Sequence, residues 1–381
     1  MDTLIDRREY AGLANCTYLN QASLGLIPRV SVEASTRFLV DVAQHGNLRL
    51  SDQAEAEILD SLRAAAAELL GASVGSVAVI GGASEGLGQI AALLSHPDGE
   101  VILVPSDFPS VTYPWLAAHE RSGMHIRWVP DVASKNLTDS LVDAISERTT
   151  AICVSAVQFS TGTQVDVAAI VARARSVGAQ VVVDVTQMAG ALPVTMSVWG
   201  VDALVCSGYK WLSAPGGVAL LAVAENLAAA IPPLVGWKGS STPFDFTPAE
   251  LSLAEDARRF ELSTMSYSAA LGLLASIELF SGIGLDSIRE HADRLAKNLA
   301  ERTAPLGWTP YRPLSDQSAC GHIVSLRHPS ASPDEVQAAL ADEYGIVTSS
   351  RVGGIRVSLH LYNSDDDVRA LAEALESIDR R

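Results

Sequence analysis

Short apolar runs alternate with helical patterns of apolar and polar residues over 53–223. The runs are hydrophobic at nearly every position, which is typical of strands that are buried on both faces of a sheet. Strands are expected at 76–80, 100–104, 125–129, 150–155, 180–184, 203–206 and 218–223. Helices are expected at 53–70, 84–95, 111–122, 138–146, 166–177 and 223–231. The alternation predicts an α/β fold whose mostly parallel, seven-stranded sheet is covered by helices.

The pattern changes after about residue 245. A helix is expected at each of 266–280, 284–303 and 365–378, and a strand near each of 321–326 and 354–360. This succession predicts a smaller C-terminal α+β domain at 246–381, beside a large domain at 31–245. Residues 1–30 are expected to form an arm that packs on the small domain.

Composition narrows the classes of function. The net charge of −17 over 381 residues, without any basic cluster, does not favour a nucleic-acid partner. Prolines, glycines and Glu225 interrupt the most apolar region, 212–236, so no membrane span is expected. The first ten residues are too charged for a signal peptide. Four scattered cysteines favour neither disulfides nor a metal site, so a reducing cytoplasm is expected.

Lys210 and Asp184 are the most informative pair in the chain. Lys210 lies between two apolar runs, and Asp184 ends a third run 26 residues earlier. Ligands of parallel sheets bind at the carboxyl ends of the strands, where both residues are expected. A pyridoxal phosphate enzyme needs such a pair, because the lysine forms a Schiff base and the acid keeps the pyridine nitrogen protonated. Alternatively, Asp184 caps a helix that begins at Val185.

Other strand ends supply further candidates. The segment Gly81-Gly-Ala-Ser84 precedes a helix and could seat a phosphate, although an ordinary glycine turn fits the same pattern. The hydroxyls of Ser207 and Tyr209 could form the other side of a phosphate cup, and Gln187 could bond the 3-oxygen of the ring. Phe108 could stack on a flat cofactor or simply fill the core.

A strictly alternating segment lies near the C-terminus. It places Arg356, Ser358, His360 and Tyr362 on one face of a strand. An arginine on such a face suits bidentate capture of a substrate carboxylate. The alternative is a solvent-exposed sheet face.

These residues and motifs resemble the class V aminotransferase superfamily of fold-type I pyridoxal phosphate enzymes. The superfamily includes cysteine desulfurases, selenocysteine lyases, kynureninases and isopenicillin N epimerase-like proteins. The resemblance covers nearly the whole chain, in the segments Tyr18–Gly25, Gly81–Glu85, Asp184–Gln187, Ser207–Lys210, Arg259–Thr264 and Arg356–Asn363.

The resemblance implies a role for each candidate. Lys210 carries the cofactor and shuttles protons, Asp184 pairs with the pyridine nitrogen, and Gln187 bonds the 3-oxygen. Arg356 binds the α-carboxylate of a small amino-acid substrate, while Asn20 and Gln21 border its pocket. The phosphate contacts come from Ala83, Ser84, Ser207, Tyr209 and Trp237. Thr264 would reach the phosphate of a neighbouring subunit, in a homodimer with a shared active site.

Departures from the family pattern bear on the reaction. Cysteine desulfurases carry a nucleophilic cysteine before the carboxylate-binding arginine, but the segment 346–355 has none, so a persulfide mechanism is not expected. Phe108 stands where desulfurases have a ring-stacking histidine, as in kynureninase-like members. Ser263 replaces the glycine that usually precedes Thr264.

The expected reaction is β-elimination by a C–S lyase on a cysteine-derived substrate. Transamination, epimerisation and decarboxylation-coupled oxidative deamination of an S-conjugated cysteine in secondary metabolism remain open. A Rossmann-type oxidoreductase that uses the Gly81 loop would leave Lys210 and Asp184 unexplained. A non-catalytic binding protein with this fold would be expected to lose the lysine.

Overall fold

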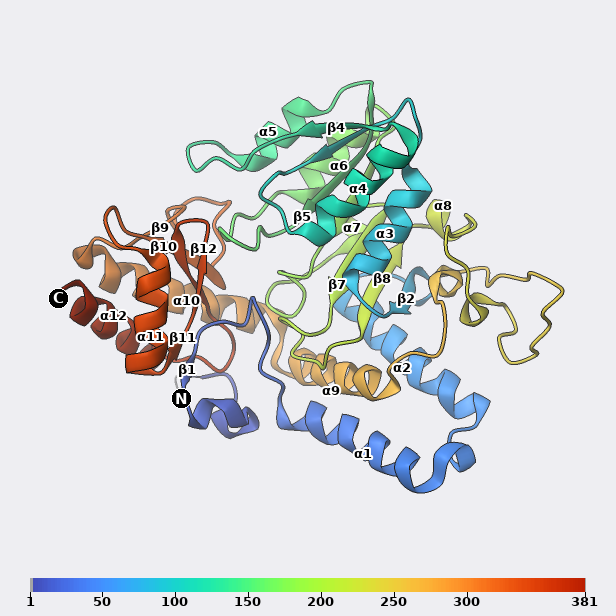
Figure 1. Ribbon diagram of the computed structural model, residues 1–381, viewed down its shortest axis with the longest axis horizontal. Helices are drawn as coiled ribbons and strands as arrows, with labels where there is room; N and C mark the ends of the chain where they lie inside the picture. Colours follow the sequence, from blue (N-terminus) through green and yellow to red (C-terminus); the bar gives the residue numbers. More distant parts are fainter. Residues whose placement is uncertain (1–2, 381) are drawn as a thin grey trace.

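A seven-stranded sheet forms the centre of the computed structural model, which describes residues 3–380 (Figure 1). Its strand order is β2-β8-β7-β6-β5-β3-β4. Strand β8 is antiparallel to β2 and β7, and the other neighbouring pairs are parallel. The strands are β2 (Val77–Ile80), β3 (Glu100–Leu103), β4 (His125–Trp128), β5 (Thr149–Ser155), β6 (Gln180–Asp184), β7 (Ala203–Ser207) and β8 (Ala219–Val223). The predicted mostly parallel sheet is therefore confirmed.

Helices cover both faces of this sheet. Alternate strand residues enter two separate apolar clusters, so Val181 and Val183 of β6 belong to one and Val182 to the other. Helix α2 (Asp52–Leu70) precedes β2, and the helices that follow strands of this sheet are α3 (Ala83–Leu94), α4 (Pro109–Ser122), α5 (Leu137–Ala144), α6 (Val167–Arg175), α7 (Met196–Trp199) and α8 (Glu225–Ala228). The helix predicted at 223–231 is thus only a single turn.

Helix α1 (Arg29–His45) was not predicted. It lies alongside α9 (Tyr267–Ile283) in Figure 1, and only Ser31 of its residues is buried. Several of its apolar side chains, Val32, Leu39 and Val40, stay exposed. Helix α9 packs against α1 and α2.

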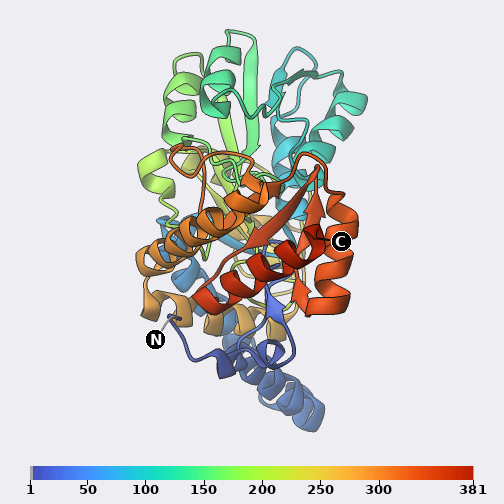
Figure 2. The ribbon, with the colours of Figure 1, turned by 90° about the vertical axis from the view of Figure 1, so that its left-hand side faces the viewer.

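The C-terminal part forms a second, smaller α+β layer (Figure 2). Its antiparallel sheet has the order β12-β13-β10-β9. These strands are β9 (Thr309–Pro310), β10 (Ile323–Arg327), β12 (Ser349–Arg351) and β13 (Gly354–Ser358). They pack with α10 (Leu285–Thr303), α11 (Pro333–Tyr344) and α12 (Asp365–Asp379) around a core that includes Trp308 and Leu340. Helix α11 was not predicted, and the strand expected at 354–360 ends at Ser358.

The N-terminal segment is attached to this C-terminal part. Strand β1 (Thr17–Tyr18) pairs in parallel with β11 (Ile346–Val347), and Arg7 forms an ion pair with Asp367. The domain boundaries stay a prediction, and residues 1, 2 and 381 lie outside the described residues. Single 3₁₀ turns occur at Arg7–Glu9, Ala11–Ala14, Gly46–Leu48, Val74–Ser76, Trp237–Gly239, Ala257–Phe260 and Ala304–Leu306.

Within residues 3–380, no single helix is long and apolar enough to cross a membrane. The segments Tyr267–Ile283 and Leu285–Leu306 meet the length and composition requirement only as a pair, with a bend of 76° between them.

Candidate active site

The carboxyl ends of β3, β5, β6 and β7 meet at one edge of the large sheet and enclose a cavity, as parallel topology requires. Seven of the ten residues predicted to bind the cofactor line it. The lining residues are Ala83, Phe108, Ser110, Ser155, Phe159, Asp184, Thr186, Gln187, Ser207, Tyr209 and Lys210. The structure thus brings together side chains from positions 83 to 210.

Lys210 follows β7, and only 6% of its surface is exposed. Its Nζ lies 4.9 Å from the centre of the Phe108 ring. Burial lowers the pKa of this amine to about 8, although the negative charge of Asp184 opposes the shift. An amine with this pKa is partly neutral near physiological pH, which is the form needed for nucleophilic attack or for proton abstraction.

The loop that carries Lys210 is held by the N-terminal segment. Gln21 Nε2 donates to the carbonyl oxygen of Lys210 (2.9 Å) and to Ser213 Oγ (2.8 Å). Gln21 Oε1 accepts from the Leu26 amide and from the Tyr362 hydroxyl. All the hydrogen-bonding positions of this amide are occupied, so Gln21 holds the lysine loop, and its place at the border of the substrate pocket stays a prediction.

Gly25 lies directly against the backbone of the loop that carries Lys210. A Cβ at this position would lie 2.2 Å from the Lys210 carbonyl oxygen, so only glycine fits the approach. Its amide donates to the Tyr209 carbonyl at 2.8 Å.

Asp184 ends β6 and is buried. Its Oδ1 accepts from the amide of Thr186 (2.7 Å), within a turn rather than at the start of a helix, so the helix-cap alternative is wrong. Burial raises the pKa of this carboxyl to about 6. A cation such as a pyridinium nitrogen beside it would favour the charged form, which fits the predicted role.

Gln187 is oriented by its neighbours. Trp211 Nε1, which can only donate, bonds Gln187 Oε1 at 2.7 Å, so the amide orientation is determined. Gln187 Nε2 donates one hydrogen to the carbonyl of Ala22 (3.1 Å). Its second hydrogen remains for an acceptor such as the 3-oxygen of the cofactor.

Two helix N-termini meet beside the cavity. Ala83 and Ser84 begin α3, and Pro109 and Ser110 begin α4, with the two serine hydroxyls 2.7 Å apart. Neither helix has a side-chain cap, so the amides of both first turns lack such partners, as suits an anion site. Ser110 was missed, although it follows a strand end in the same way as Ser84.

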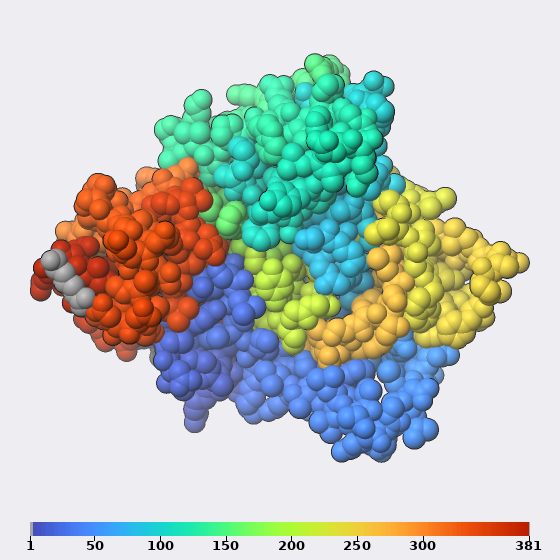
Figure 3. All heavy atoms as spheres, viewed as in Figure 1, coloured from blue at the N-terminus to red at the C-terminus, as the bar shows by residue number. Residues whose placement is uncertain are grey.

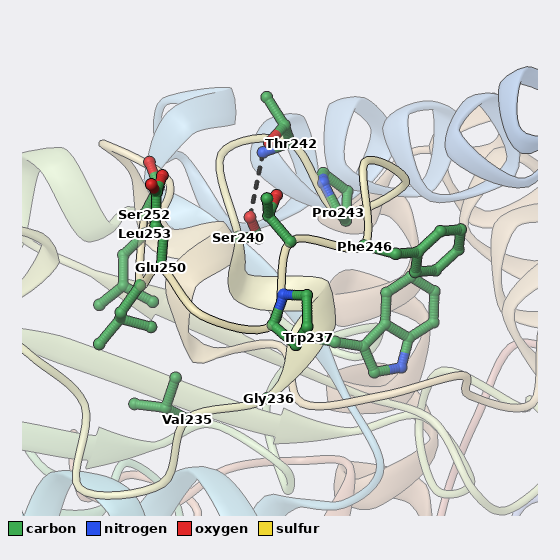
Figure 4. A pocket seen from close by; sticks show the side chains of 13 residues that line it. Val235, Gly236, Trp237, Ser240, Thr242, Pro243, Phe246, Glu250, Ser252 and Leu253 are labelled. Carbon is green, nitrogen blue, oxygen red and sulfur yellow. Dashed lines mark hydrogen bonds between the residues drawn. The ribbon is translucent and has the colours of Figure 1, made fainter.

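Trp237 and Thr264 do not line this cavity. Trp237 packs against Phe244 and Phe246 and lines a separate surface cavity of about 410 Å³ (Figure 4). Thr264 is exposed. Trp237 therefore does not reach the cavity of its own chain, and the contact of Thr264 with the phosphate of a neighbouring subunit stays a prediction.

Arg356 of β13 is buried, and none of its hydrogen bonds is to a carboxylate. Its Nη1 donates to the Phe159 carbonyl (2.8 Å), and its Nη2 donates to Asn20 Oδ1 (3.3 Å) and to Ser23 Oγ. Its Nε has no partner among the described residues. Burial lowers the pKa of the guanidinium to about 9, and its charge acts on Lys210. Asn20 lies beside this arginine, whereas Ser23 was missed.

The other residues of the predicted polar face have structural positions. Ser358 Oγ accepts from the Ala22 amide (3.2 Å). His360 is buried and stacks on Trp211, with ring centres 5.3 Å apart. Neither the exposed face nor a continuous polar substrate face is present, because β13 is buried on both sides.

Asp107 is a further residue that the sequence reasoning missed. This buried carboxylate accepts from the Phe108 amide (2.7 Å), from the amide and hydroxyl of Ser155, and from Gln158 Nε2 (3.1 Å). It thereby fixes the loop of Phe108 against the end of β5. Its position directly after a strand and before Phe108 could have identified it from the sequence.

Within residues 3–380, no group of three or more His, Cys, Asp or Glu side chains could hold a metal ion. The donors around the cavity instead fit pyridoxal phosphate. They provide an amine at Lys210, a buried acid at Asp184 that lacks a bonded cation, a free amide hydrogen at Gln187 and two open helix N-termini.

Known proteins resemble the chain over nearly its full length. A probable cysteine desulfurase from Aeropyrum pernix is 30% identical over 388 residues, covering 95% of this chain and 94% of that protein. An apo cysteine desulfurase from Thermococcus onnurineus NA1 shares the fold with a TM-score of 0.87, at 24% identity over 98% of this chain and 97% of the other. A cystine C–S lyase in complex with its product cysteine persulfide gives 0.86, at 24% identity over 96% and 98%.

The family match agrees with the resemblance inferred from the motifs. The aminotransferase class-V family matches residues 17–371, which include every predicted site residue. The chain belongs to the aminotransferase class-V family, and it is a pyridoxal phosphate-dependent enzyme.

Proposed function

We propose that this enzyme is a C–S lyase that eliminates a sulfur group from the β-carbon of a cysteine-derived amino acid. The relatives named as cysteine desulfurases and as a cystine C–S lyase support a sulfur-containing amino acid as substrate. The absence of a suitable thiol supports elimination rather than persulfide transfer.

The segment before Arg356 is the observation that separates elimination from persulfide transfer. Here β12 and β13 are joined by the two-residue turn Val352-Gly353, whose φ angles of 44° and 76° are those of a tight hairpin. The hairpin contains no cysteine. Cys153, Cys206 and Cys320 are buried elsewhere, and burial raises the pKa of each thiol.

Cys16, the fourth cysteine, is only partly buried, but its Sγ lies 3.5 Å from the Gly12 carbonyl oxygen, and burial raises the pKa of its thiol as well. None of the four cysteines therefore supplies a thiolate nucleophile.

The chain's own residues can perform an elimination. When bound, pyridoxal phosphate withdraws electrons from the α-carbon of an attached amino acid. Arg356 would hold the α-carboxylate, since its Nε has no partner and its other contacts are neutral. Lys210 Nζ would take the α-proton, and the electron pair would then expel the β-substituent as a thiolate. Hydrolysis of the remaining 2-aminoacrylate gives pyruvate and ammonia.

We also propose a homodimer with a shared active site, located in the cytoplasm. Residues 231–253 project from the molecule and expose Ile231, Leu234, Phe246 and Leu251 (Figure 3). Trp237 and Thr264 lie in the same part of the chain, outside their own cavity, so their phosphate roles would be exercised in a partner. All four cysteines are free, which suits a reducing compartment.

A product assay tests the proposed reaction. The purified enzyme is incubated with cystine, S-alkyl cysteines, cysteine and alanine, and pyruvate, ammonia, thiol, alanine and aldehyde are measured together. Pyruvate, ammonia and thiol in equal amounts support elimination. Alanine as the product would indicate desulfurase chemistry, and an aldehyde with carbon dioxide would indicate decarboxylative deamination. The Lys210→Ala variant serves as the blank.

A further inference from the structure

A tight loop, Gln158–Thr163, lies between the cofactor cavity and the C-terminal part of the molecule. It follows β5, and its ends are closed by two bonds, from the Gln158 amide to the Thr163 carbonyl and from the Gly162 amide to the Gln158 carbonyl. Gly162 has a φ of 72°, and a Cβ there would lie 2.1 Å from the Ile323 carbonyl oxygen. We call this segment the Phe159 loop.

Phe159 joins two parts of the active site. Its carbonyl accepts the 2.8 Å hydrogen bond from Arg356 Nη1. Its ring meets the ring of Phe108 edge to face, with centres 5.3 Å apart and planes at 81°. The position of this one residue therefore affects both the arginine proposed to bind substrate and the ring beside Lys210.

The base of the loop is anchored by a buried ion pair. Asp131 Oδ2 accepts from the hydroxyls of Thr161 (3.0 Å) and Thr163 (2.9 Å). Arg312 Nη2 donates to Asp131 Oδ1 (2.7 Å), and its Nε donates to Thr163 Oγ1 (2.8 Å). The side chains of Arg312 and Asp131 are 2% and 1% exposed.

Arg312 also binds the segment that follows β4. Its Nη2 contacts the carbonyls of Val132 (3.3 Å) and Lys135 (3.0 Å), and its Nη1 contacts that of Ala133 (3.5 Å). Since Arg312 follows β9, it ties the C-terminal sheet to both loops of the large sheet at once.

We propose that Arg312 is a positioning residue for substrate binding. Through Thr163 and Asp131 it fixes the Phe159 loop, and the Phe159 carbonyl then sets the plane of the Arg356 guanidinium. Capture of a carboxylate by an arginine fork depends on that plane. The inference rests on the proposed function, in which Arg356 binds the α-carboxylate.

The test compares an amino acid with the same molecule lacking its carboxylate. The cofactor-loaded enzyme is titrated with L-alanine and with ethylamine, and binding is followed by the visible absorption of the cofactor. In Arg312→Lys the positive charge beside Asp131 is kept, but one ammonium cannot replace the fork to Thr163 and the carbonyls. We expect the dissociation constant of L-alanine to rise about tenfold, since small misplacements of a binding group cost this much or more. Ethylamine binding should change by less than about twofold, because ethylamine has no carboxylate.

Matched variants separate positioning from a general structural effect. Arg63 also donates two hydrogen bonds from its guanidinium to a buried carboxylate, that of Glu261, and this pair does not touch the Phe159 loop. Arg63→Lys should therefore leave the binding of both ligands unchanged. Thr163→Val replaces Arg312→Lys if the latter does not fold, because it removes the one hydroxyl that accepts from Arg312 and donates to Asp131.

A double-mutant cycle completes the test. Arg356→Ala should weaken L-alanine but not ethylamine, and adding Arg312→Lys to it should cause no further loss. Equal weakening of both ligands by Arg312→Lys, or additive losses in the double variant, would overturn the positioning role. If Arg356→Ala itself leaves L-alanine binding unchanged, the proposed function fails at that residue instead.

Discussion

Two buried arginines on the C-terminal sheet have opposite surroundings. Arg312 faces the carboxylate of Asp131, donates to four further acceptors and forms a second ion pair, with Asp316 at 3.6 Å. Arg356, which is 1% exposed, has only a carbonyl, an amide and a hydroxyl as partners, and its Nε has none among the described residues. Burying a charge is costly unless it is paired. The paired arginine therefore stabilises the fold, and the unpaired one is held ready for a ligand that brings its own negative charge.

The same contrast holds for the groups around Lys210. Burial moves the pKa of Lys210 down and that of Asp184 up, and no salt bridge joins these two described residues. Groups whose charged forms are disfavoured in this way are frequent at functional sites. In the cavity, folding buries Lys210 and Asp184 without an ion pair. In the loops around Arg312, folding pairs the buried arginine with the carboxylate of Asp131.

The largest expected effect is loss of catalysis without loss of fold. Lys210→Ala should lower turnover by about 10⁴-fold, the upper end of what positioned acid–base groups contribute. Its unfolding midpoint should equal or exceed that of the wild type, because a buried amine is removed. Steady-state assays and chemical denaturation measure both quantities. Retained turnover would contradict the assignment of Lys210.

The comparison of the two arginines is tested directly by stability. Arg312→Met should lower the free energy of unfolding by about 3–5 kcal/mol, because Asp131 is left buried and unpaired. Arg356→Met should stay within about 1 kcal/mol of the wild type, since relief from charge burial offsets the lost bonds. Guanidinium denaturation of both variants gives the values. Similar losses in the two variants would remove the distinction.

The pH dependence of stability tests the unneutralised acid in the cofactor-free protein. The folded protein keeps a proton on Asp184 up to about pH 6, whereas an ordinary aspartate loses it at about 3.8. Because the folded state binds more protons in this window, the free energy of unfolding should fall by about 2 kcal/mol from pH 4 to pH 6. In Asp184→Asn this contribution should vanish. An identical slope in the variant would show that Asp184 is not the group responsible.

A smaller effect on catalysis is expected when Arg356 keeps its charge but loses the planar guanidinium group. Arg356→Lys should raise KM for the amino-acid substrate by about tenfold with little change in kcat, because a lysine keeps the charge but presents no planar pair of donors. Initial rates over a range of substrate concentrations measure the split between the two constants. A fall in kcat with constant KM would place Arg356 in the chemical step instead.

The large sheet was predictable because most of its strands are apolar on both faces; the exception is the edge strand β4, whose residues are largely exposed. All seven strands match the expected ranges to within one residue, and the strand-end rule then placed Asp184, Ser207 and Lys210 at one edge. Helices α1 and α11 were missed, and they bury few side chains: only Ser31 in α1, and only Val336 and Leu340 in α11. Hydrophobic periodicity marks helix faces that pack on the core, and α1 and α11 each have only a small buried face.

The site was less predictable than the sheet. Gln21 lies in a segment that resembles the family, but its hydrogen bonds to the Lys210 carbonyl and to Tyr362 connect positions that are 189 and 341 residues apart. No local pattern encodes such pairings. The links of Arg312 to the Phe159 loop were invisible for the same reason, since a buried ion pair is formed by tertiary packing.

The contacts of the first 25 residues have a consequence for biogenesis. The Leu19 carbonyl receives the amide of Ser358, Tyr18 pairs with Val347, and Gln21 holds the lysine loop. A nascent chain cannot complete this set of contacts until residue 358 has left the ribosome, because the Leu19 carbonyl needs the amide of Ser358. Assembly of the catalytic chamber, and with it stable uptake of the vitamin-derived cofactor, therefore waits until the chain has been synthesised through residue 358.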